Sequence, residues 1–251
     1  MTTTEKGSEI AKNGFQNEDD VVFIFNHWKE SFIAKEWLLA MNYDLNEIEY
    51  VKAKKIKGSY KADIQVKISI LIKLKKIEDI QNLQVKLVSN SQGFNQIDKR
   101  WVKNYKELWG FDDNVEQILK YFTGEIEPYK KDTKDKRRMF FNEMTGKQQQ
   151  TILDFFTKNK VLILTDILKG RGKFSAEWML VILKMKNEKL KWVLKPMNYC
   201  LNFFGEGSVE ITKQGSLKIG KITMQRKGGD AGRKTAQMLQ FKINPCLLFN
   251  E

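Results

Sequence analysis

The chain has 251 residues, of which 41% are hydrophobic, and a formal net charge of +13 at pH 7. This length and hydrophobic content predict a globular protein with a substantial core, and the charge favours a polyanionic partner, either nucleic acid or an anionic membrane surface. The N-terminus has no apolar signal-peptide core, and the most apolar run, ISILI, is too short to span a bilayer, so we expect no insertion into a membrane.

The few cysteines and histidines narrow the possible chemistry. Cys200 and Cys246 lie far apart without CxxC spacing, which excludes a cysteine-based zinc site and favours a reducing, cytoplasmic location. The single histidine, His27, lies in a helical pattern, and we expect a structural or surface role for it. Carboxylates, amides and lysines remain as the catalytic groups, and they favour metal-assisted chemistry.

The hydrophobic pattern predicts the first elements in chain order. Residues 8–30 are expected to form one helix and residues 31–42 a second, with Ser31 as its N-cap. A basic connector at 52–61 leads to a half-buried strand at 62–74, in which apolar and polar residues alternate. A turn or linker at 75–81, a strand at 82–90 and a polar loop at 91–101 leading into a helix are expected to follow.

The second half mixes helices and strands. We expect a helix at 112–122, a charged loop at 128–138, and a helix at 149–159 preceded by a capping box of Thr145 and Gln148. Strands are expected at 161–168, 177–185 and 189–198, then a short helix at 199–205 and alternating strand segments within 208–243. The order predicts a mixed α/β protein with a central sheet flanked by helices. It forms either two portions, 1–128 and 129–251, or one compact domain.

Three polar side chains occupy matching faces of the two strands at 62–74 and 82–90. If these strands pair as a hairpin, Asp63, Gln84 and Lys86 bring a carboxylate, an amide and an ammonium to one place. A carboxylate and a carbonyl-type oxygen can hold Mg²⁺, and a nearby lysine can bind phosphate or orient the attacking water. The set suits phosphodiester hydrolysis, although a solvated strand face would show the same alternation.

The arrangement of Asp63 before an alternating strand and then Gln84-x-Lys86 resembles the PD-(D/E)xK nuclease superfamily, with Gln84 in place of the second acid. Longer segments closely resemble the HinP-type restriction endonucleases, small type II enzymes that cut GCGC. These segments are AKNGFQNEDD, the Y-K-x-D approach to Asp63, IQNLQVKLVSNSQGFNQIDKRW, TKDKRRMF, LTDILKGRGKFSAEW and ITMQRKGGDAGRKTAQMLQFKI.

The resemblance implies a PD-(D/E)xK restriction-endonuclease-like fold, with a mixed central sheet flanked by helices and a C-terminal β-rich DNA-binding part. It implies a Mg²⁺-dependent enzyme that acts on double-stranded DNA and has a companion DNA methyltransferase. Asp63 would be the metal-binding acid, Gln84 would take the second-acid position, the backbone carbonyl of Val85 would add a ligand, and Lys86 would be the family lysine. Glu18 is either a helical acid that supports the metal site or an ordinary helix-surface residue.

Two regions carry candidate DNA contacts. Asn95, Gln96 and Lys99 follow the catalytic strand and can donate to base edges or phosphates, and Phe94 is either a wedge between base steps or part of a small core. Arginine reads guanine and aspartate accepts from cytosine, so the expected base contacts are Gln225, Arg226 and Asp230. The expected phosphate contacts are Lys136, Arg137, Arg171, Lys227 and Arg233.

The sequence therefore predicts a type II restriction endonuclease that cuts duplex DNA at a short GC-rich site, GCGC or a close relative, and leaves 5′-phosphate ends. It would act alone, as a homodimer or with a second nuclease subunit. One alternative is a subunit of a two-protein restriction enzyme that reads a longer or asymmetric site and nicks one strand. Another is a catalytically inactive DNA-binding module, because glutamine is a poorer metal ligand than an acid.

Overall fold

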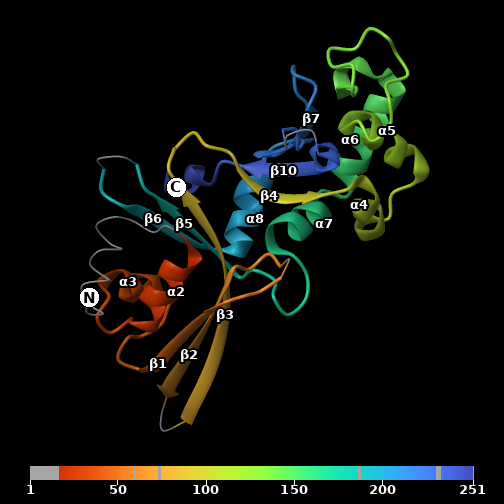
Figure 1. The fold of residues 1–251 in the computed structure, drawn as a ribbon. Helices are drawn as coiled ribbons and strands as arrows, with labels where there is room; N and C mark the ends of the chain where they lie inside the picture. Colours follow the sequence, from red (N-terminus) through yellow and green to blue (C-terminus); the bar gives the residue numbers. More distant parts are fainter. Residues whose placement is uncertain (1–16, 59, 73–74, 186–187, 230–232, 251) are drawn as a thin grey trace. The chain divides into compact units, whose positions relative to one another are not determined.

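The computed structural model describes residues 17–58, 60–72, 75–185, 188–229 and 233–250 (Figure 1). The chain forms two compact units. Unit 1 consists of Met1–Gly93, Lys169–Cys200 and Asn244–Glu251, and unit 2 consists of Phe94–Leu168 and Leu201–Ile243. The expected division after residue 128 falls within unit 2, because strands from both halves of the sequence pair in each sheet.

Unit 1 contains a mixed sheet with the strand order β1-β2-β3-β5-β6. Neighbouring strands are antiparallel except β3 and β5, which are parallel. The hairpin expected from the alternating pattern is present, because β2 pairs with β3 in a register that sets Ile64 opposite Leu83. The strands are β1 (Ile48–Lys55), β2 (Ile64–Ile72), β3 (Lys75–Val88), β5 (Trp178–Leu183) and β6 (Lys191–Pro196).

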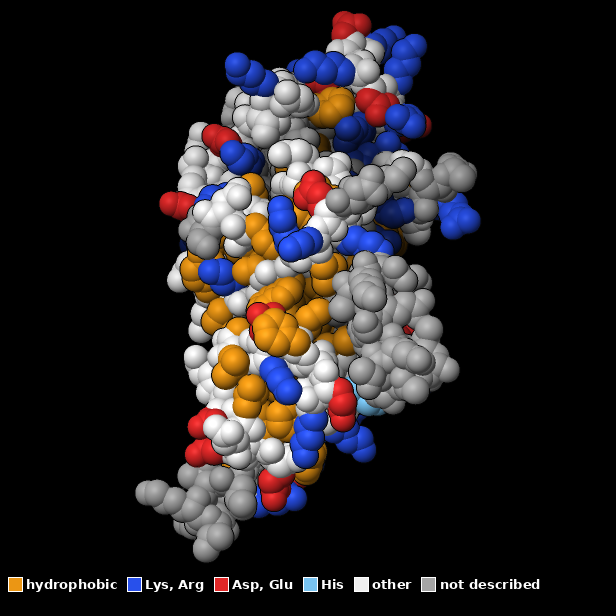
Figure 2. Space-filling model, turned by 90° about the vertical axis from the view of Figure 1, so that its left-hand side faces the viewer, with side chains coloured by type: hydrophobic (Ala, Val, Ile, Leu, Met, Phe, Trp, Pro, Cys, Tyr) orange, Lys and Arg blue, Asp and Glu red, His pale blue; other side chains and the backbone are white. Residues whose placement is uncertain are grey.

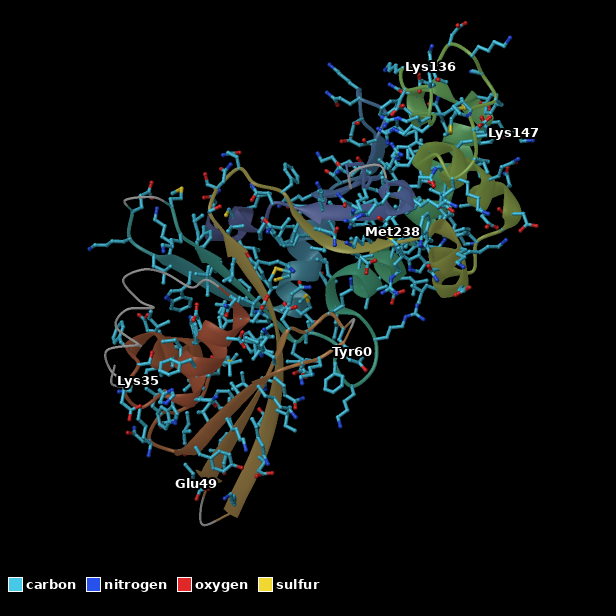
Figure 3. The ribbon with its side chains drawn as sticks, viewed as in Figure 1. Lys35, Glu49, Tyr60, Lys136, Lys147 and Met238 are labelled. Carbon is cyan, nitrogen blue, oxygen red and sulfur yellow. The ribbon has the colours of Figure 1, made fainter. Side chains whose placement is uncertain are left out.

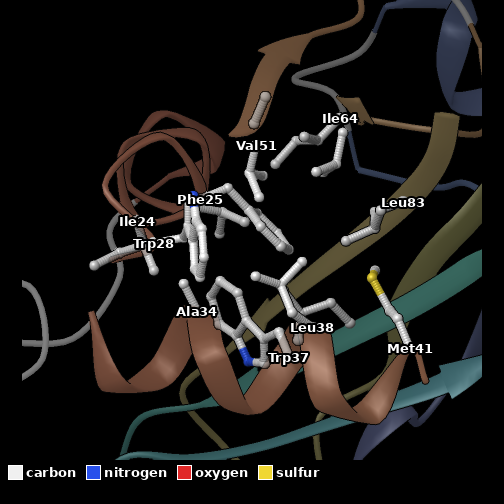
Figure 4. Close-up of a cluster of buried hydrophobic side chains, with 14 of the residues drawn as sticks. Ile24, Phe25, Trp28, Ala34, Trp37, Leu38, Met41, Val51, Ile64 and Leu83 are labelled. Carbon is white, nitrogen blue, oxygen red and sulfur yellow. The ribbon is translucent and has the colours of Figure 1, made fainter. Parts of the chain in front are cut away.

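Helices α2 (Glu18–Asn26) and α3 (Phe32–Ala40) pack against the apolar face of this sheet (Figure 4). Phe25 and Trp37 are completely buried, with ring centroids 5.0 Å apart. Val51, Ile64 and Leu83 extend the same core from three strands. Burial of each such side chain stabilises the fold by about 1.5–3 kcal/mol, so the core fixes the faces of β2 and β3 that point away from it.

The two helices begin at side-chain caps. Asn17 has extended backbone and accepts a hydrogen bond from the Asp19 amide at 2.8 Å, so α2 begins at Glu18, and it ends before His27. The predicted helix at 8–30 is therefore confirmed only for Glu18–Asn26, and its part before residue 17 lies outside the described residues. The Ser31 cap is confirmed, with its Oγ accepting from the Ala34 amide at 3.2 Å.

Two charged segments that were predicted to be irregular are strands. Residues 52–55 of the expected connector at 52–61 belong to β1, and the expected turn at 75–81 is the first half of β3. The charges of residues 75–81, which favoured a turn, have partners on other strands of the same sheet. Lys67 pairs with Glu78 at 2.7 Å and Lys76 with Glu49 at 3.2 Å, and such cross-strand pairs stabilise a sheet.

Unit 2 contains an antiparallel sheet with the strand order β4-β10-β9-β8-β7. This sheet confirms the strands expected within 208–243. The strands are β4 (Asn95–Arg100), β7 (Val209–Ile211), β8 (Leu217–Ile219), β9 (Ile222–Arg226) and β10 (Leu239–Ile243). The helical elements are α4 (Val102–Trp109), α5 (Asp113–Thr123), η1 (Phe141–Glu143), α6 (Gly146–Lys158), α7 (Lys160–Leu164), η2 (Thr165–Lys169) and η4 (Lys234–Gln237).

Helices α5 and α6 confirm the sequence prediction in detail. Val115, Ile118, Leu119 and Phe122 are the buried face of α5. At the start of α6, the Gln148 amide donates to Thr145 Oγ1 at 3.3 Å and the Thr145 amide donates to Gln148 Oε1 at 3.0 Å, which is the expected capping box. The segment 128–138 is a loop with one isolated bridge between Asp135 and Arg138.

Two other segments of this part of the chain differ from expectation. Residues 95–100, predicted to be a loop, form β4, because they pair with β10 from the far end of the chain. Residues 161–168, predicted to be a buried strand, are helical in α7 and η2. Val161 is 78% exposed, so this run isn't buried on both sides. Asp166 is buried instead and accepts a hydrogen bond from Trp109 Nε1 at 2.9 Å.

The remaining segments agree with prediction. β5 and β6 are the strands expected at 177–185 and 189–198, and α8 (Met197–Gly205) is the expected short helix. The chain ends in η5 (Pro245–Asn250). In the part of the chain that the structure describes, no helix is long and apolar enough to cross a membrane. Figure 2 shows one face of the molecule, on which hydrophobic side chains lie among lysine and arginine.

Candidate active site

The site begins where β2 and β3 stop pairing. Asp63 immediately precedes β2, and the last paired residues of the two strands are Ile64 and Leu83. The Asp63 amide donates to the Leu83 carbonyl at 2.8 Å. Its side-chain Oδ2 accepts from the Val85 amide at 2.7 Å. The backbone of β3 therefore holds the Asp63 carboxylate beside the residues of β3 that follow Leu83.

Gln84 is almost fully buried, with 2% of its surface exposed. Its Nε2 donates to the Lys61 carbonyl at 3.3 Å. Its Oε1 is buried and has no hydrogen-bond partner among the described residues. An amide oxygen removed from water without a partner costs free energy, so this atom is poised to accept a ligand.

The carbonyl of Val85 has the same orientation as its amide. In an antiparallel ladder, the amide and carbonyl of one residue point to the same neighbouring strand. The Val85 amide points to the β2 side, where Asp63 lies, and pairing with β2 has already ended at Leu83. The Val85 carbonyl therefore points to the Asp63 side of β3, where the ladder with β2 no longer continues.

Charge and burial act against each other at this site. Burial lowers the pKa of Lys86, while the carboxylates of Asp63 and Glu18 raise it. Burial raises the pKa of Asp63, and the charges of Lys86 and Lys61 oppose that shift. Glu18, which also lies 3.5 Å from Lys55 Nζ, is thus close enough to affect both groups. The structure brings Asp63, Gln84 and Lys86 together, and of the two readings of Glu18 it favours the one in which this acid lies near the site.

The donor set fits a hard divalent cation. Within the described ranges, no cluster of three His, Cys, Asp or Glu side chains could hold a metal ion. The available donors are instead one carboxylate, one amide oxygen without a partner and one backbone carbonyl, and Mg²⁺ accepts oxygen ligands of these types and keeps several waters.

A polar network that the sequence analysis did not identify supports β3 beside the candidate site. Gln65 Nε2 donates to Asn82 Oδ1 at 3.1 Å, and Asn82 Nδ2 donates to the Lys173 carbonyl at 3.0 Å. Glu177 accepts from the Asn82 amide at 2.9 Å. The shared faces of Gln65 and Asn82 could be inferred from the alternation, but the contacts to 173 and 177 depend on the tertiary fold.

The comparisons with known proteins show the family of this chain. A family model described as R.HinP1I restriction endonuclease matches residues 41–249. The chain belongs to this family. The matched range includes Asp63, Gln84 and Lys86 but not Glu18. The chain is thus a type II restriction endonuclease of the R.HinP1I family, which acts on DNA.

A solved structure has the same fold as this R.HinP1I family member. It is restriction endonuclease MspI in complex with its cognate DNA. The likeness has a TM-score of 0.62 at 16% sequence identity and covers 90% of this chain and 87% of that chain. At this identity the likeness concerns the fold, and it confirms the predicted restriction-endonuclease-like α/β architecture. No curated protein matches the chain.

Several predicted DNA contacts of this R.HinP1I family member lie on the sheet of unit 2. Gln240 on β10 pairs with Lys99 on β4 and with Gln225 on β9, so the three form one row across the sheet. Gln240, at the centre of this row, is buried, with 3% of its surface exposed. Gln96 is exposed, Asn95 is half-buried, and Phe94, directly before β4, is 57% exposed, which argues against the small core considered for its ring.

The other candidates lie on loops. Arg137, Arg226 and Arg233 line one cavity, which the sequence alone could not show. Lys136 is exposed beside Arg137 (Figure 3), and Lys227 is half-buried and follows β9. Arg171 is exposed in unit 1, on the loop that begins after η2. Asp230 lies outside the described residues.

The structure also places the single histidine and the two cysteines, to which the sequence analysis gave no catalytic role. His27 caps the end of α2, and its Nδ1 lies 2.8 Å from the Phe23 carbonyl. Cys200 and Cys246 are both buried free thiols. Burial raises the pKa of Cys200 to about 12, so this sulfur remains a thiol at neutral pH.

Asp63→Asn is expected to stabilise the metal-free protein at neutral pH. Burial raises the pKa of Asp63 above its ordinary value of 3.8, so the unfolded chain ionises this carboxyl at a lower pH than the folded chain does. The free energy of unfolding therefore falls as pH rises through the raised pKa. The neutral asparagine avoids this loss and still accepts a hydrogen bond from Val85 through its side-chain oxygen.

The measurement is urea unfolding of both proteins in chelator, from about pH 3.5 to pH 7. The stability of Asp63→Asn relative to wild type should increase with pH. The matched control is Asp44→Asn, which changes an exposed carboxylate in the turn before β1. A difference in the free energy of unfolding between Asp63→Asn and wild type that does not change with pH would contradict this prediction.

Proposed function

We propose that this endonuclease hydrolyses duplex DNA with Mg²⁺ at a short GC-rich site, GCGC or a close relative, and leaves 5′-phosphate ends. The observation that carries the proposal is the buried Gln84 Oε1, which has no partner in the described structure. Gln84 lies on β3 directly before Val85, whose backbone amide donates to Asp63, and two residues before Lys86. An amide oxygen in this position can replace the second acid as a metal ligand without adding a buried negative charge.

Each residue of the site then has a role. Asp63, Gln84 Oε1 and the Val85 carbonyl would hold the ion. When bound, Mg²⁺ would polarise the scissile phosphate and lower the pKa of the attacking water. Lys86, whose pKa is lowered by burial and supported by the nearby carboxylates of Asp63 and Glu18, would bind the scissile phosphate and stabilise the charge that develops on its oxygens. Glu18 acts through its charge rather than by touching the substrate.

The DNA contacts follow from exposure and chemistry. Asn95, Gln96, Lys99 and Gln225 would reach base edges, and Phe94 would insert beside a base step. Lys136, Lys227 and Arg171 would contact phosphates, and Asp230 is proposed from the sequence alone as an acceptor for cytosine. The proposed partners are double-stranded DNA, a second copy or a second nuclease subunit, and a companion methyltransferase in the same cytoplasm.

The deciding experiment incubates the purified chain with supercoiled plasmid and Mg²⁺ and sequences every end produced. Double-strand ends at one GC-containing sequence are expected, and ends at GCGC would establish that specificity. Discrete ends at another sequence would retain the chemistry and overturn the GCGC assignment. Nicks on one strand would identify a subunit of a two-protein enzyme, and binding without cutting would identify an inactive DNA-binding module.

A further inference from the structure

A cavity of about 370 Å³ lies within unit 2, away from the residues of the candidate active site in sequence and in element. Eight residues line it, and four of them are cations on two separate segments of the chain. The lining residues are Arg137, Arg226, Gly228, Gly229, Arg233, Lys234, Ala236 and Gln237. None of these described residues is acidic, and Asp230 lies outside the described part of the chain, so the described lining is strongly positive.

One carboxylate outside the lining offsets part of this charge. Asp135 accepts from Arg137 Nε at 2.9 Å and from Arg137 Nη2 at 3.0 Å. This pairing lowers the pKa of Asp135 to about 2, so the carboxylate is charged at any pH of interest. Asp135 can neutralise at most one arginine, Arg137. The other three lining cations are Arg226, Arg233 and Lys234, and their mutual repulsion favours an anion in the cavity.

Arg226 provides a second, independent observation. Its Nε is buried and has no hydrogen-bond partner in the described part of the chain. Burial and the nearby charge of Arg137 both lower its pKa. A buried cationic N–H without an acceptor costs free energy. A ligand with negative charge and acceptor oxygens would reduce the repulsion between the cations and also accept a hydrogen bond from Arg226 Nε.

The glycines keep the cavity open. Gly228 and Gly229 have φ angles of +64° and +60°, and a Cβ at either position would contact nothing within 4 Å. The sequence requires glycine here for its backbone conformation rather than for lack of space. Two consecutive residues without side chains also leave the cavity accessible to a group carried on a polymer.

We propose that this cavity binds one backbone phosphate of the DNA, and that Arg226 is a phosphate ligand rather than the base reader expected from the sequence. An arginine that reads guanine extends into the groove with its guanidinium edge exposed, whereas Arg226 is a half-buried residue whose Nε is enclosed among other cations. The inference rests on the proposed function in one respect, because it assumes that the bound phosphate belongs to the DNA backbone.

The first test uses inorganic phosphate and the metal-free full chain without DNA. Phosphate binding should raise the Tm of wild type by about 2–4 °C more than that of Arg226→Gln or Arg233→Gln. Lys147→Gln, which removes one exposed positive charge from α6 (Figure 3), should behave like wild type. Because phosphate stabilises many proteins without binding, equal shifts in all four proteins would overturn the proposal.

The second test measures the binding of a short random-sequence duplex at several salt concentrations without metal. Loss of one phosphate contact should reduce the slope of log K against log salt by about 0.9, so Arg226→Gln should show this loss while Arg226→Lys and Lys147→Gln should not. Arg233 is exposed, so Arg233→Gln tests the cavity without disturbing buried packing.

The two readouts separate a phosphate ligand from a base reader. In the cleavage assay, Arg226→Gln should lower rates at all sites without changing the sequence at the ends. An unchanged salt slope together with relaxed ends would show that Arg226 reads a base and would overturn the proposal. Failure of plasmid cleavage with both phosphate tests positive would reject only the proposed Mg²⁺-dependent cleavage at a GC-rich site.

Discussion

Lys86→Ala is expected to bind DNA as wild type does and to cut it about 10²–10⁴-fold more slowly. Lys86 lies two residues after Gln84 on β3. Burial lowers the pKa of Lys86, and the carboxylates of Asp63 and Glu18 oppose that shift. In the proposed mechanism, this ammonium stabilises the charge that develops on the scissile phosphate. A single contact contributes little to overall DNA affinity, so the loss should appear in the rate of cleavage at saturating enzyme.

The matched control is Lys67→Ala. Lys67 also lies in the sheet of unit 1, but its ammonium pairs with Glu78 at 2.7 Å on the outer part of the hairpin. Its removal should leave single-turnover cleavage within about twofold of wild type, because exposed ion pairs contribute little. Wild-type cleavage by Lys86→Ala would mean that the catalytic site has been assigned to the wrong residues.

Asp63→Asn should lower cleavage by at least about 10³-fold, which corresponds to about 4 kcal/mol of transition-state stabilisation. Asparagine preserves the shape of the side chain and an acceptor for the Val85 amide, but it removes the only carboxylate proposed to touch the ion. Gln84 Oε1 and the Val85 carbonyl are neutral and should bind Mg²⁺ weakly by themselves. The variant should thus combine higher metal-free stability with loss of activity.

Calorimetric titration with Mg²⁺, with DNA bound, distinguishes a metal defect from a folding defect. Wild type and Asp44→Asn should give the same Mg²⁺ affinity, and Asp63→Asn should give an affinity at least about tenfold weaker. Unchanged affinity with lost cleavage would assign Asp63 to catalysis without metal binding. Unchanged cleavage would reject the proposed site.

The sequence predicted which residues of the candidate site share a hairpin, while their catalytic roles stay a prediction. Local alternation was enough to place Asp63, Gln84 and Lys86 on one hairpin, because side-chain direction in a strand follows from position alone. The resemblance supplied the role of each residue and the position of Glu18. The absence of a partner for Gln84 Oε1 could not be predicted, since it depends on which N–H and O–H donors the fold brings near this oxygen.

Elements that depend on distant partners were missed. The segment 95–100 is polar and forms a strand only because β10 pairs with it. The segment 75–81 is charged, yet its charges have cross-strand partners such as Lys67 for Glu78. At 161–168 the β-branched residues favour a strand by propensity, but the buried Asp166 bonded to Trp109 fits the helical path instead.

The division of the chain between its units determines which truncations are tolerable. The residues of the candidate active site all belong to unit 1, but so does the stretch after Ile243. There Cys246 and Leu248 are buried, and Asn244 Nδ2 donates to the Ser91 carbonyl at 2.9 Å. A stop codon after residue 243 would thus damage the unit that carries Asp63, although the lesion lies far downstream of it.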